Sequence, residues 1–221
     1  MNRLRRIPGN NIADYIAAAA FLIVLSLLPL FLNRFLMSLA LLILFWAYLG
    51  NAWNIMGGYT GLFSFGHAMF YGIGAYTSTV LLVDYALSPL VGMLVGALIA
   101  GLFGALIGYL LSRFGVRGHF FALGTFAIAE MVRLFATELE FINTSIGIHI
   151  PLVRGDSWVR LQFEETFANY YYVILLLFII GQIVTITLVR NKLGYYFQAI
   201  REDEEAAAAL GVDVLRYKVI S

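Results

Sequence analysis

The sequence lacks cysteine entirely, and charged residues make up only 12% of its 221 positions. The absence of cysteine excludes disulfides, thiol nucleophiles, iron–sulfur clusters and cysteine-ligated zinc. Soluble domains carry about 25% charged residues, so this chain has too few to cover a globular surface, which argues against a soluble enzyme. The net charge of +1 comes with no long basic block, so nucleic acid is not an expected partner. Low charge together with high hydrophobicity also excludes a disordered protein.

Apolar residues take up most of the chain: 62% are hydrophobic, and the mean hydropathy is +0.87. A transmembrane helix needs about 17–25 mostly apolar residues to cross a bilayer core of about 30 Å. Six continuous runs satisfy this requirement, at residues 15–32, 35–53, 67–83, 89–111, 118–137 and 170–189. The sequence therefore predicts an all-α, polytopic membrane protein with six transmembrane helices.

Positive charges indicate the direction of these spans. The positive-inside rule places the basic residues before the first run in the cytoplasm, and alternate crossings then put ten basic residues inside and three outside. The inner ones are Arg3, Arg5, Arg6, Arg113, Arg117, Arg190, Lys192, Arg201, Arg216 and Lys218, and the outer ones are Arg34, Arg154 and Arg160. We therefore predict a cytoplasmic N-terminus, a first run that is an anchor rather than a cleaved signal, and a long external loop at residues 138–169.

An uncharged, glycine-rich segment, residues 57–67, separates the second and third runs. Its composition fits a broken or re-entrant backbone, which is tolerated at membrane depth only where protein or a water-filled cavity surrounds it. Helix ends exposed there attract the charged groups of a substrate. Two interpretations stay open: the segment lines a translocation pathway, or its glycines only allow close helix packing. The candidate pathway residues are Gly61, Ser64, Gly66, His67, Tyr71, Gly72 and Gly74.

The fourth run carries small residues at every fourth position. This spacing lines one face of a helix with small side chains and lets a second helix approach closely. We expect helix packing along this row, which consists of Gly92, Gly96, Ala100, Gly104 and Gly108.

Two ionisable residues, Glu130 and Arg133, lie within the fifth run and share one face of a helix. Charges inside a span are costly, and they are functional candidates for that reason. Their place in the outer half of the span favours pairing with each other or snorkelling to the interface, while contact with a substrate stays open.

The segment 190–218 contains an acidic cluster followed by four alanines. Acidic residues favour the first turn of a helix, alanine favours its interior, and Gly211 stands where a helix would end. We therefore predict a short cytoplasmic helix over residues 202–210, whose small alanine face suits the groove of a partner. A solvated connecting helix is the alternative. Asp213 is expected to cap a further helix aimed at the membrane.

Three blocks of this sequence resemble branched-chain amino acid ABC transporter permeases. The first covers residues 58–76 and includes Ser-Phe-Gly-His-Ala-Met-Phe-Tyr-Gly-Ile-Gly-Ala-Tyr from residue 64. The second, looser block covers residues 117–130, and the third, residues 199–218, is similar to the cytoplasmic coupling loop of these permeases. The blocks occur in family order, and the likeness extends over nearly the whole chain.

The resemblance implies an importer of several subunits. Such permeases pair two homologous membrane subunits with two ATP-hydrolysing subunits and a periplasmic protein that delivers leucine, isoleucine, valine or a related small ligand. The resemblance assigns a coupling helix to about residues 199–212, which docks on an ATPase subunit; the candidate coupling residues are Gly194, Ala199, Arg201, Glu202, Asp203, Glu204, Ala207, Leu210 and Gly211. The chain has no Gly-x-x-x-x-Gly-Lys-[Ser/Thr] motif, so ATP and magnesium are expected on the partners and no cofactor or metal is expected in this chain.

The expected function is that of a permease subunit in a bacterial or archaeal inner membrane, which moves branched-chain amino acids by alternating access and is not an enzyme. A urea or short-amide importer permease is the near alternative. A secondary transporter would place ionisable residues deep in several spans, and this chain offers only Glu130, Arg133 and His67. A membrane-embedded enzyme would need a metal cluster or an acid–base set, and the sequence shows neither a metal cluster nor a convincing acid–base set. Because family members continue with further spans, the resemblance implies that residues 1–221 are a permease domain that is incomplete at its C-terminus.

Overall fold

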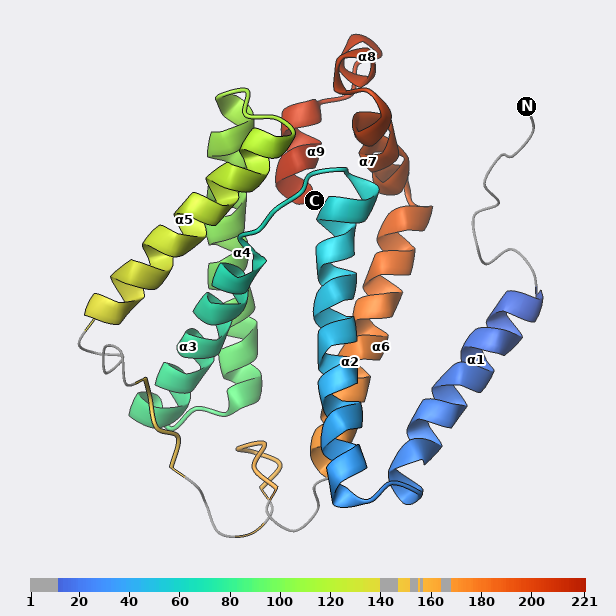
Figure 1. Ribbon diagram of the computed structural model, residues 1–221, viewed down its shortest axis with the longest axis vertical. Coiled ribbons are helices and arrows are strands. Elements are labelled where there is room, and N and C mark those ends of the chain that lie inside the picture. Colours follow the sequence, from blue (N-terminus) through green and yellow to red (C-terminus); the bar gives the residue numbers. More distant parts are fainter. Residues whose placement is uncertain (1–11, 140–146, 152–154, 156, 164–167) are drawn as a thin grey trace.

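A computed structural model describes residues 12–139, 147–151, 155, 157–163 and 168–221 of the chain (Figure 1). Within these ranges every regular element is a helix, and Ser157 and Gln162 form an isolated antiparallel bridge. The helices are α1 (Ile12–Leu27) with the 3-10 turn η1 (Leu28–Leu30), α2 (Arg34–Asn54) with the π-helical turn η2 (Ile55–Tyr59), α3 (His67–Tyr85), α4 (Pro89–Arg113), α5 (His119–Glu138), α6 (Ala168–Arg190), α7 (Lys192–Glu202), α8 (Glu204–Ala209) and α9 (Val214–Ile220). This confirms the all-α prediction.

Helices occupy all six apolar runs, and four of them are long and apolar enough to cross a membrane. These four are α2 together with η2, α4, α5 and α6. The helix formed by α1 and η1 is shorter, while α3 has 19 residues but carries Thr77, Ser78 and Thr79 in one stretch. A multi-pass membrane protein is thus confirmed through four helices, and the first and third spans stay predictions.

The helices alternate in direction, so their termini collect at two opposite ends of the molecule (Figure 1). One end, here called the α8 end, holds the last residues of α2, α4 and α6, the first residues of α3 and α5, and helices α7 to α9. Among the described residues, the basic ones at the α8 end are Arg113, Arg117, Arg190, Lys192, Arg201, Arg216 and Lys218, while Arg34 and Arg160 belong to the opposite end. This is the separation of charge that the predicted topology requires; Arg3, Arg5, Arg6 and Arg154 lie outside the described residues.

Helices α1, α2 and α6 form one packed group, in which α6 lies along α2 (Figure 1). Its buried core consists of Met37, Leu44, Tyr171 and Leu175. The Tyr171 hydroxyl donates a hydrogen bond to the carbonyl oxygen of Leu25 at 2.8 Å, which ties α6 to α1. Asn51 donates from Nδ2 to Thr185 Oγ1 at 3.0 Å. Polar bonds between apolar helices fix which faces meet.

Helices α3, α4 and α5 form the second group, and α3 packs against α4. A Cβ atom on Gly96 would lie 2.8 Å from the carbonyl oxygen of Gly74, and one on Gly92 would lie 2.6 Å from Ser78 Oγ. Backbones can approach this closely only where side chains are absent or small. Farther along the same row, Gly104 faces the ring of Phe70, Gly108 faces α9, and Ala100 is half-buried.

Capping residues set the positions of the two tight turns. The Asn33 side chain accepts a hydrogen bond from the amide of Leu36 and starts α2. Ser88 caps α4 in the same way, and Pro89 follows it in the first turn. The turn between α3 and α4 is short, because α3 continues to Tyr85 and α4 starts at Pro89.

Candidate coupling and translocation site

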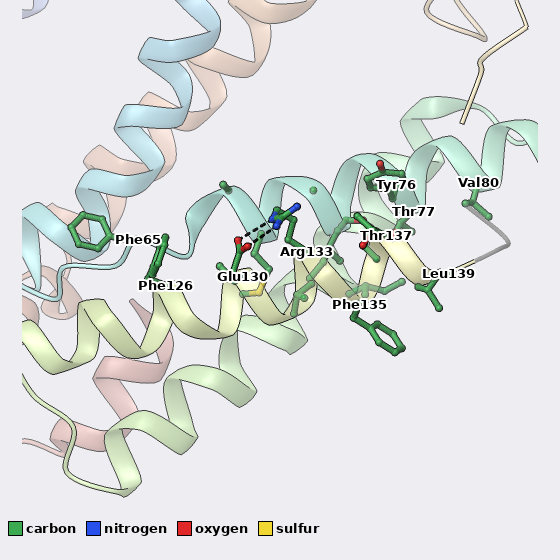
Figure 2. A pocket seen from close by; sticks show the side chains of 18 of the residues that line it. Phe65, Tyr76, Thr77, Val80, Phe126, Glu130, Arg133, Phe135, Thr137 and Leu139 are labelled. Carbon is green, nitrogen blue, oxygen red and sulfur yellow. Dashed lines mark hydrogen bonds and ion pairs between the residues drawn. The ribbon is translucent and has the colours of Figure 1, made fainter. Parts of the chain in front are cut away.

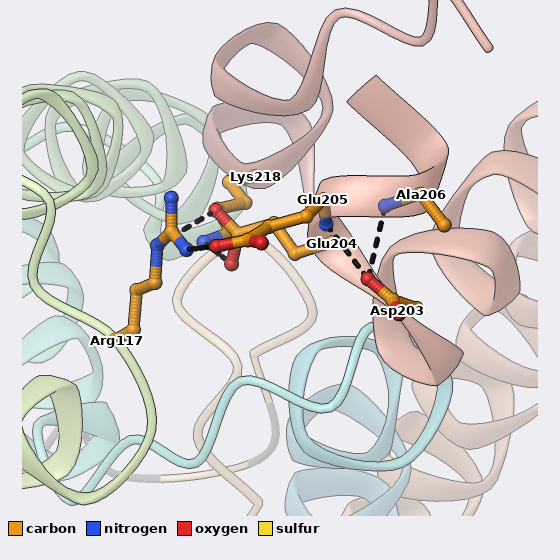
Figure 3. Close-up of polar contacts among 6 residues, drawn as sticks. All are labelled: Arg117, Asp203, Glu204, Glu205, Ala206 and Lys218. Carbon is orange, nitrogen blue, oxygen red and sulfur yellow. Dashed lines mark hydrogen bonds and ion pairs between the residues drawn. The ribbon is translucent and has the colours of Figure 1, made fainter. Parts of the chain in front are cut away.

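The chain leaves α6 and forms α7, α8 and α9 in succession (Figure 1). Asp203, between α7 and α8, has an extended backbone with φ −157° and ψ 110°. Its carboxylate accepts hydrogen bonds from the amides of Glu205 and Ala206, both at 2.9 Å, and so caps α8 (Figure 3). The prediction of one helix over residues 202–210 is therefore wrong at its start: Glu202 ends α7, and Asp203 interrupts the helix because its side chain replaces backbone bonds.

The end of α8 and the start of α9 follow the residue types. Gly211 has a φ of +86°, the left-handed conformation that stops a helix. Asp213 accepts a hydrogen bond from the amide of Arg216 at 3.1 Å and caps α9. Helix α9 then packs against α4, and Tyr217 stacks on Tyr196 of α7 with ring centroids 4.5 Å apart.

Basic side chains from two other elements hold the acidic start of α8 (Figure 3). Arg117, in the connection from α4 to α5, lies 3.3 Å from Glu204 and 3.1 Å from Glu205. Lys218 of α9 donates from Nζ to Glu204 Oε2 at 2.6 Å, and its side chain is only 3% exposed. Asp203 and Glu204, both predicted to contact an ATPase, thus make contacts within the chain.

The outer face of α8 is small and apolar. Leu210 is 87% exposed at the C-terminal end of the helix, and the three alanines at positions 206, 208 and 209 are exposed beside it. Ala207, in contrast, is only 3% exposed and is buried against the rest of the protein. We define the α8 face as Ala206, Ala208, Ala209 and Leu210. The structure therefore places Leu210 on an accessible surface and removes Ala207 from it.

Helix α7 presents a buried face to the rest of the α8 end. Gly194, Phe197 and Ile200 are buried on it, and Ala199 is half-buried. A side chain on Gly194 would collide with the backbone of Val189, so glycine is required at the bend from α6 into α7. The segment 190–218 thus contains, before the predicted helix, a further helix over Lys192–Glu202 that was not predicted.

The last turn of α7 holds the end of α2. Arg201 donates from Nη1 to the carbonyl oxygen of Gly58 at 2.6 Å. The stem of Arg201 also covers Gly61, where an added Cβ would lie 2.9 Å from Arg201 Cγ. Gly61 has a φ of +75°, so both its backbone conformation and its neighbour favour glycine.

Residues 60–66, here called the crossover segment, run from the α2 group to the α3 group (Figure 1). Thr60 and Ser64 are each 2% exposed. Trp53 of α2 donates from Nε1 to the carbonyl oxygen of Ser64 at 3.0 Å. The amide of Phe65 donates to Thr125 Oγ1 of α5 at 3.2 Å. Hydrogen bonds to α2 and α5 therefore fix both sides of this non-helical segment.

The broken backbone predicted for residues 57–67 is shorter than expected. Gly57 and Gly58 belong to the π-helical turn η2, and His67 is already the first residue of α3. A π-helical turn frees carbonyls from their usual partners, and such turns gather at functional sites. Here the carbonyl of Gly58 is the one that Arg201 binds.

A groove of about 720 Å³ lies between α3 and α5, with part of α4 behind it (Figure 2). Glu130 and Arg133 of α5 line it and form two bonds: Nη2 to Oε1 at 2.6 Å and Nε to Oε2 at 2.9 Å. Phe65 and Phe126 lie at one end of the groove, and Tyr76, Thr77 and Thr137 lie toward the other end (Figure 2). An ion pair thus stands in the middle of an otherwise mostly apolar groove.

The structure separates the predicted pathway residues into three places. Gly72 lines the groove with Glu130 and Arg133. Gly61, Ser64 and Gly66 belong to the crossover segment, where an added Cβ on Gly66 would lie 3.0 Å from the Thr125 carbonyl oxygen. The other three residues lie elsewhere on α3. The His67 ring makes an edge-to-face contact with Phe70, and the Tyr71 ring lies 5.7 Å, centroid to centroid, from Phe45 of α2. Gly74 faces Gly96 of α4.

Several groove residues were absent from the sequence prediction. On α5, Phe126 and Thr137 line the groove together with the ion pair. Phe126 lies four residues before Glu130 and Thr137 lies four residues after Arg133, which places them on the same helical face, so the sequence did carry a signal. The α3 wall, which includes Met69 and Ile73, could not be assigned because sequence alone does not show that α3 faces α5.

The sequence of this chain matches, over residues 35–221, the family model described as branched-chain amino acid transport system, permease component. The match covers most of the chain, which therefore belongs to this family of transport permeases, as its resemblance suggested.

Two curated relatives point the same way. The chain is 30% identical to the high-affinity branched-chain amino acid transport system permease protein LivM of Escherichia coli (strain K12), in an alignment that covers 98% of this chain and 55% of that protein. It is 29% identical to the LivM protein of Salmonella typhimurium (strain LT2), with the same coverage. The chain spans about half the length of these relatives. No solved structure gives a significant match.

Proposed function

We propose that this chain is the permease subunit of an ATP-driven importer that carries leucine, isoleucine and valine across the inner membrane by alternating access. Family membership, the names of the two relatives and the four long apolar helices support this function. The proposed partners are a second homologous permease subunit, two ATP-binding subunits that hold ATP and magnesium, and a periplasmic binding protein. In this proposal α1 and α3 complete six spans, the N-terminus is cytoplasmic, and the α8 end faces the cytoplasm.

The observation that carries the proposal is the position of α8. It lies at the tip of the molecule, beyond the ends of the membrane-crossing helices (Figure 1). Its exposed face is a leucine surrounded by alanines, a small apolar surface that suits insertion into the groove of another protein. We propose that the α8 face docks in an ATP-binding subunit, so that α8 is the coupling helix.

Two sets of contacts would carry a displacement of α8 into the spans. Glu204 connects α8 through Arg117 to the start of α5, and through Lys218 to α9, which packs on α4. Helix α7 connects through Arg201 to Gly58 at the end of α2. The two helix groups are therefore attached to the same cytoplasmic unit at different points, and its movement would tilt one group against the other.

Transport by the assembled complex tests the function. Proteoliposomes that contain the permease subunits and ATP-binding subunits are given the loaded binding protein outside and ATP inside, and uptake of labelled leucine is measured. We expect uptake that requires ATP. Uptake that persists without ATP and follows a proton or sodium gradient would establish a secondary transporter instead. Import of urea or a short amide but not of leucine would establish the near alternative.

Cross-linking tests the docking of α8, and the chain is suited to it because it contains no cysteine. In Leu210→Cys, a short cross-linker is expected to join the permease to an ATP-binding subunit. The matched control is Tyr85→Cys, which is also exposed at 69% but lies at the end of α3, opposite the α8 end. Equal cross-linking of both variants, or of neither, would reject the proposed docking face.

A further inference from the structure

We propose that the groove between α3 and α5 binds the transported amino acid, with Glu130 holding its ammonium group, Arg133 its carboxylate and the apolar walls its aliphatic side chain. This inference rests on the proposed function and extends it, because it assigns the two ends of a zwitterion to two named side chains. It goes beyond the sequence prediction, which favoured pairing or snorkelling for these residues.

Glu130 and Arg133 lie near the middle of α5. Glu130 follows the start of α5 by eleven residues, so it lies about 16 Å along the helix at a rise of about 1.5 Å per residue. A bilayer core is about 30 Å thick, which puts the pair well inside it. Ionisable side chains at that depth face protein or a water-filled cavity, not lipid. The face of α5 that carries Glu130 and Arg133 is therefore closed off from lipid in the assembled transporter.

The ion pair is accessible from the groove. The side chains of Glu130 and Arg133 are 43% and 60% exposed, so they line an open space and are not packed into a core. Each is the partner of the other, and in the described part of the chain no other charged side chain lines the groove. A zwitterion entering this space offers both residues a new partner, so neither charge is left unpaired when their mutual bonds break.

The two charged groups match the two charged ends of an amino acid. A guanidinium matches a carboxylate in shape and binds it through two parallel hydrogen bonds. A carboxylate accepts the hydrogen bonds of an ammonium group, which has only donors. The ligand therefore supplies a new charged partner to each residue, so the bonds between Glu130 and Arg133 are exchanged for bonds of the same kind. A neutral amide cannot replace both partners, which makes the groove selective for amino acids over urea.

The apolar walls of the groove suit the aliphatic side chain of the ligand. Met69 and Ile73 of α3 and Phe126 of α5 line the same groove as the ion pair and offer it apolar surface. The volume of about 720 Å³ lies within the about 300–1,000 Å³ of typical small-molecule sites. An aliphatic side chain is therefore removed from water on entering, while the charged end meets Glu130 and Arg133.

Cysteine labelling shows whether the groove is open to water in the full complex. Gly72 lines the groove, and an added Cβ there meets nothing within 4 Å, so Gly72→Cys fits without displacing a neighbour. We expect a charged thiol reagent to label it, and saturating leucine to abolish most of that labelling. Gly101→Cys on α4 is the control, since it is equally unobstructed but does not line the groove. An unreactive Gly72→Cys would mean that another helix fills the groove, and labelling that leucine leaves unchanged would mean that the ligand passes elsewhere; either result overturns the inference.

Charge variants separate substrate contact from a structural ion pair. Glu130→Gln and Arg133→Gln are each expected to lower leucine uptake about tenfold or more, the effect of losing one charged hydrogen bond. The double variant Glu130→Arg/Arg133→Glu keeps the pair but reverses its direction, and its leucine uptake is expected to stay as low as that of the single variants. Glu138→Gln, the same substitution outside the groove on the same helix, is expected to transport normally. Recovery of uptake in the reversed pair would show a structural role and reject the inference.

Different results would reject the proposed transport function and the proposed binding site. If the wild-type complex shows no ATP-dependent leucine uptake, the proposed function is wrong. If the wild-type complex transports leucine while Glu130→Gln and Arg133→Gln transport as well as it does, the function stands and the groove is not the binding site.

Discussion

Arg201 of α7 binds the carbonyl oxygen of Gly58 at 2.6 Å and thereby links α7 to the π-helical turn at the end of α2. The contact joins residues that are 143 positions apart in the chain. It adjoins the crossover segment, because the stem of the same arginine covers Gly61. The link therefore lies between the part of the chain proposed to meet the ATPase and the part that leads into α3.

Arg201→Ala is expected to uncouple ATP hydrolysis from transport. A coupling contact of about 1–3 kcal/mol changes a linked equilibrium about 5- to 150-fold, so leucine uptake per ATP hydrolysed should fall at least about fivefold in proteoliposomes. Binding of the ATPase should persist, since Arg201 does not belong to the α8 face. Arg216→Ala is the control, an exposed arginine on α9 whose described contact is made by its backbone amide. Equal coupling in the two variants would show that the link to Gly58 is not used.

Glu204→Gln is expected to destabilise the packing of α8 and α9 at the α8 end. Lys218 is 3% exposed and depends on Glu204 for its charge partner, so the variant leaves a buried cation without one. Breaking a buried pair in this way costs about 3–5 kcal/mol, and because Glu204 is 24% exposed we expect about 3 kcal/mol in the free energy of unfolding, measured in detergent. The double variant Glu204→Gln/Lys218→Met should recover most of the loss. A Glu204→Gln protein as stable as the exposed control Glu202→Gln would contradict the assignment.

The helices were largely predictable because bilayer thickness imposes a length on each apolar run. The capping residues were equally informative: Gly211 and Asp213 lie where their conformational preferences place them. The interruption at Asp203 was not foreseen, since an acidic residue suits both the first turn of a helix and the position before it. Only the backbone conformation shows that Asp203 occupies the capping position before the first turn of α8.

The parts that escaped prediction depend on contacts between distant segments. The turn η2 follows α2, and the carbonyl of Gly58 in this turn is bound by Arg201, which is far away in the sequence. Glu130 and Arg133 were found as intramembrane charges, but their groove needs α3 as a second wall. Ala207 and Leu210 looked alike as members of one short helix, and the packing of α8 buries the first and exposes the second.

Leu210→Asp is expected to weaken binding of the ATP-binding subunit while leaving the fold intact. Removing a central interface residue costs about 2 kcal/mol or more, which corresponds to an about 30-fold rise in Kd. The stability of the permease should change by less than about 0.5 kcal/mol, because Leu210 is 87% exposed. Leu87→Asp, in the turn between α3 and α4, provides an exposed control at the opposite end. Unchanged affinity in Leu210→Asp, measured with purified subunits, would remove α8 as the docking helix.

Gly96→Ala and Gly101→Ala should change stability in opposite directions, although the same methyl group is added to the same helix. At position 96 the new Cβ would lie 2.8 Å from a carbonyl oxygen and 3.0 Å from the Cα of Gly74, and these backbone atoms cannot rotate away. Helices α3 and α4 must then separate, and overpacking of this kind costs about 1–3 kcal/mol. At position 101 nothing lies within 4 Å, so the methyl group only reduces backbone freedom and should gain about 0.5–1 kcal/mol. Thermal unfolding of both variants in one detergent measures the difference, and a stabilising effect of alanine at position 96 would show that α3 and α4 do not pack along this row.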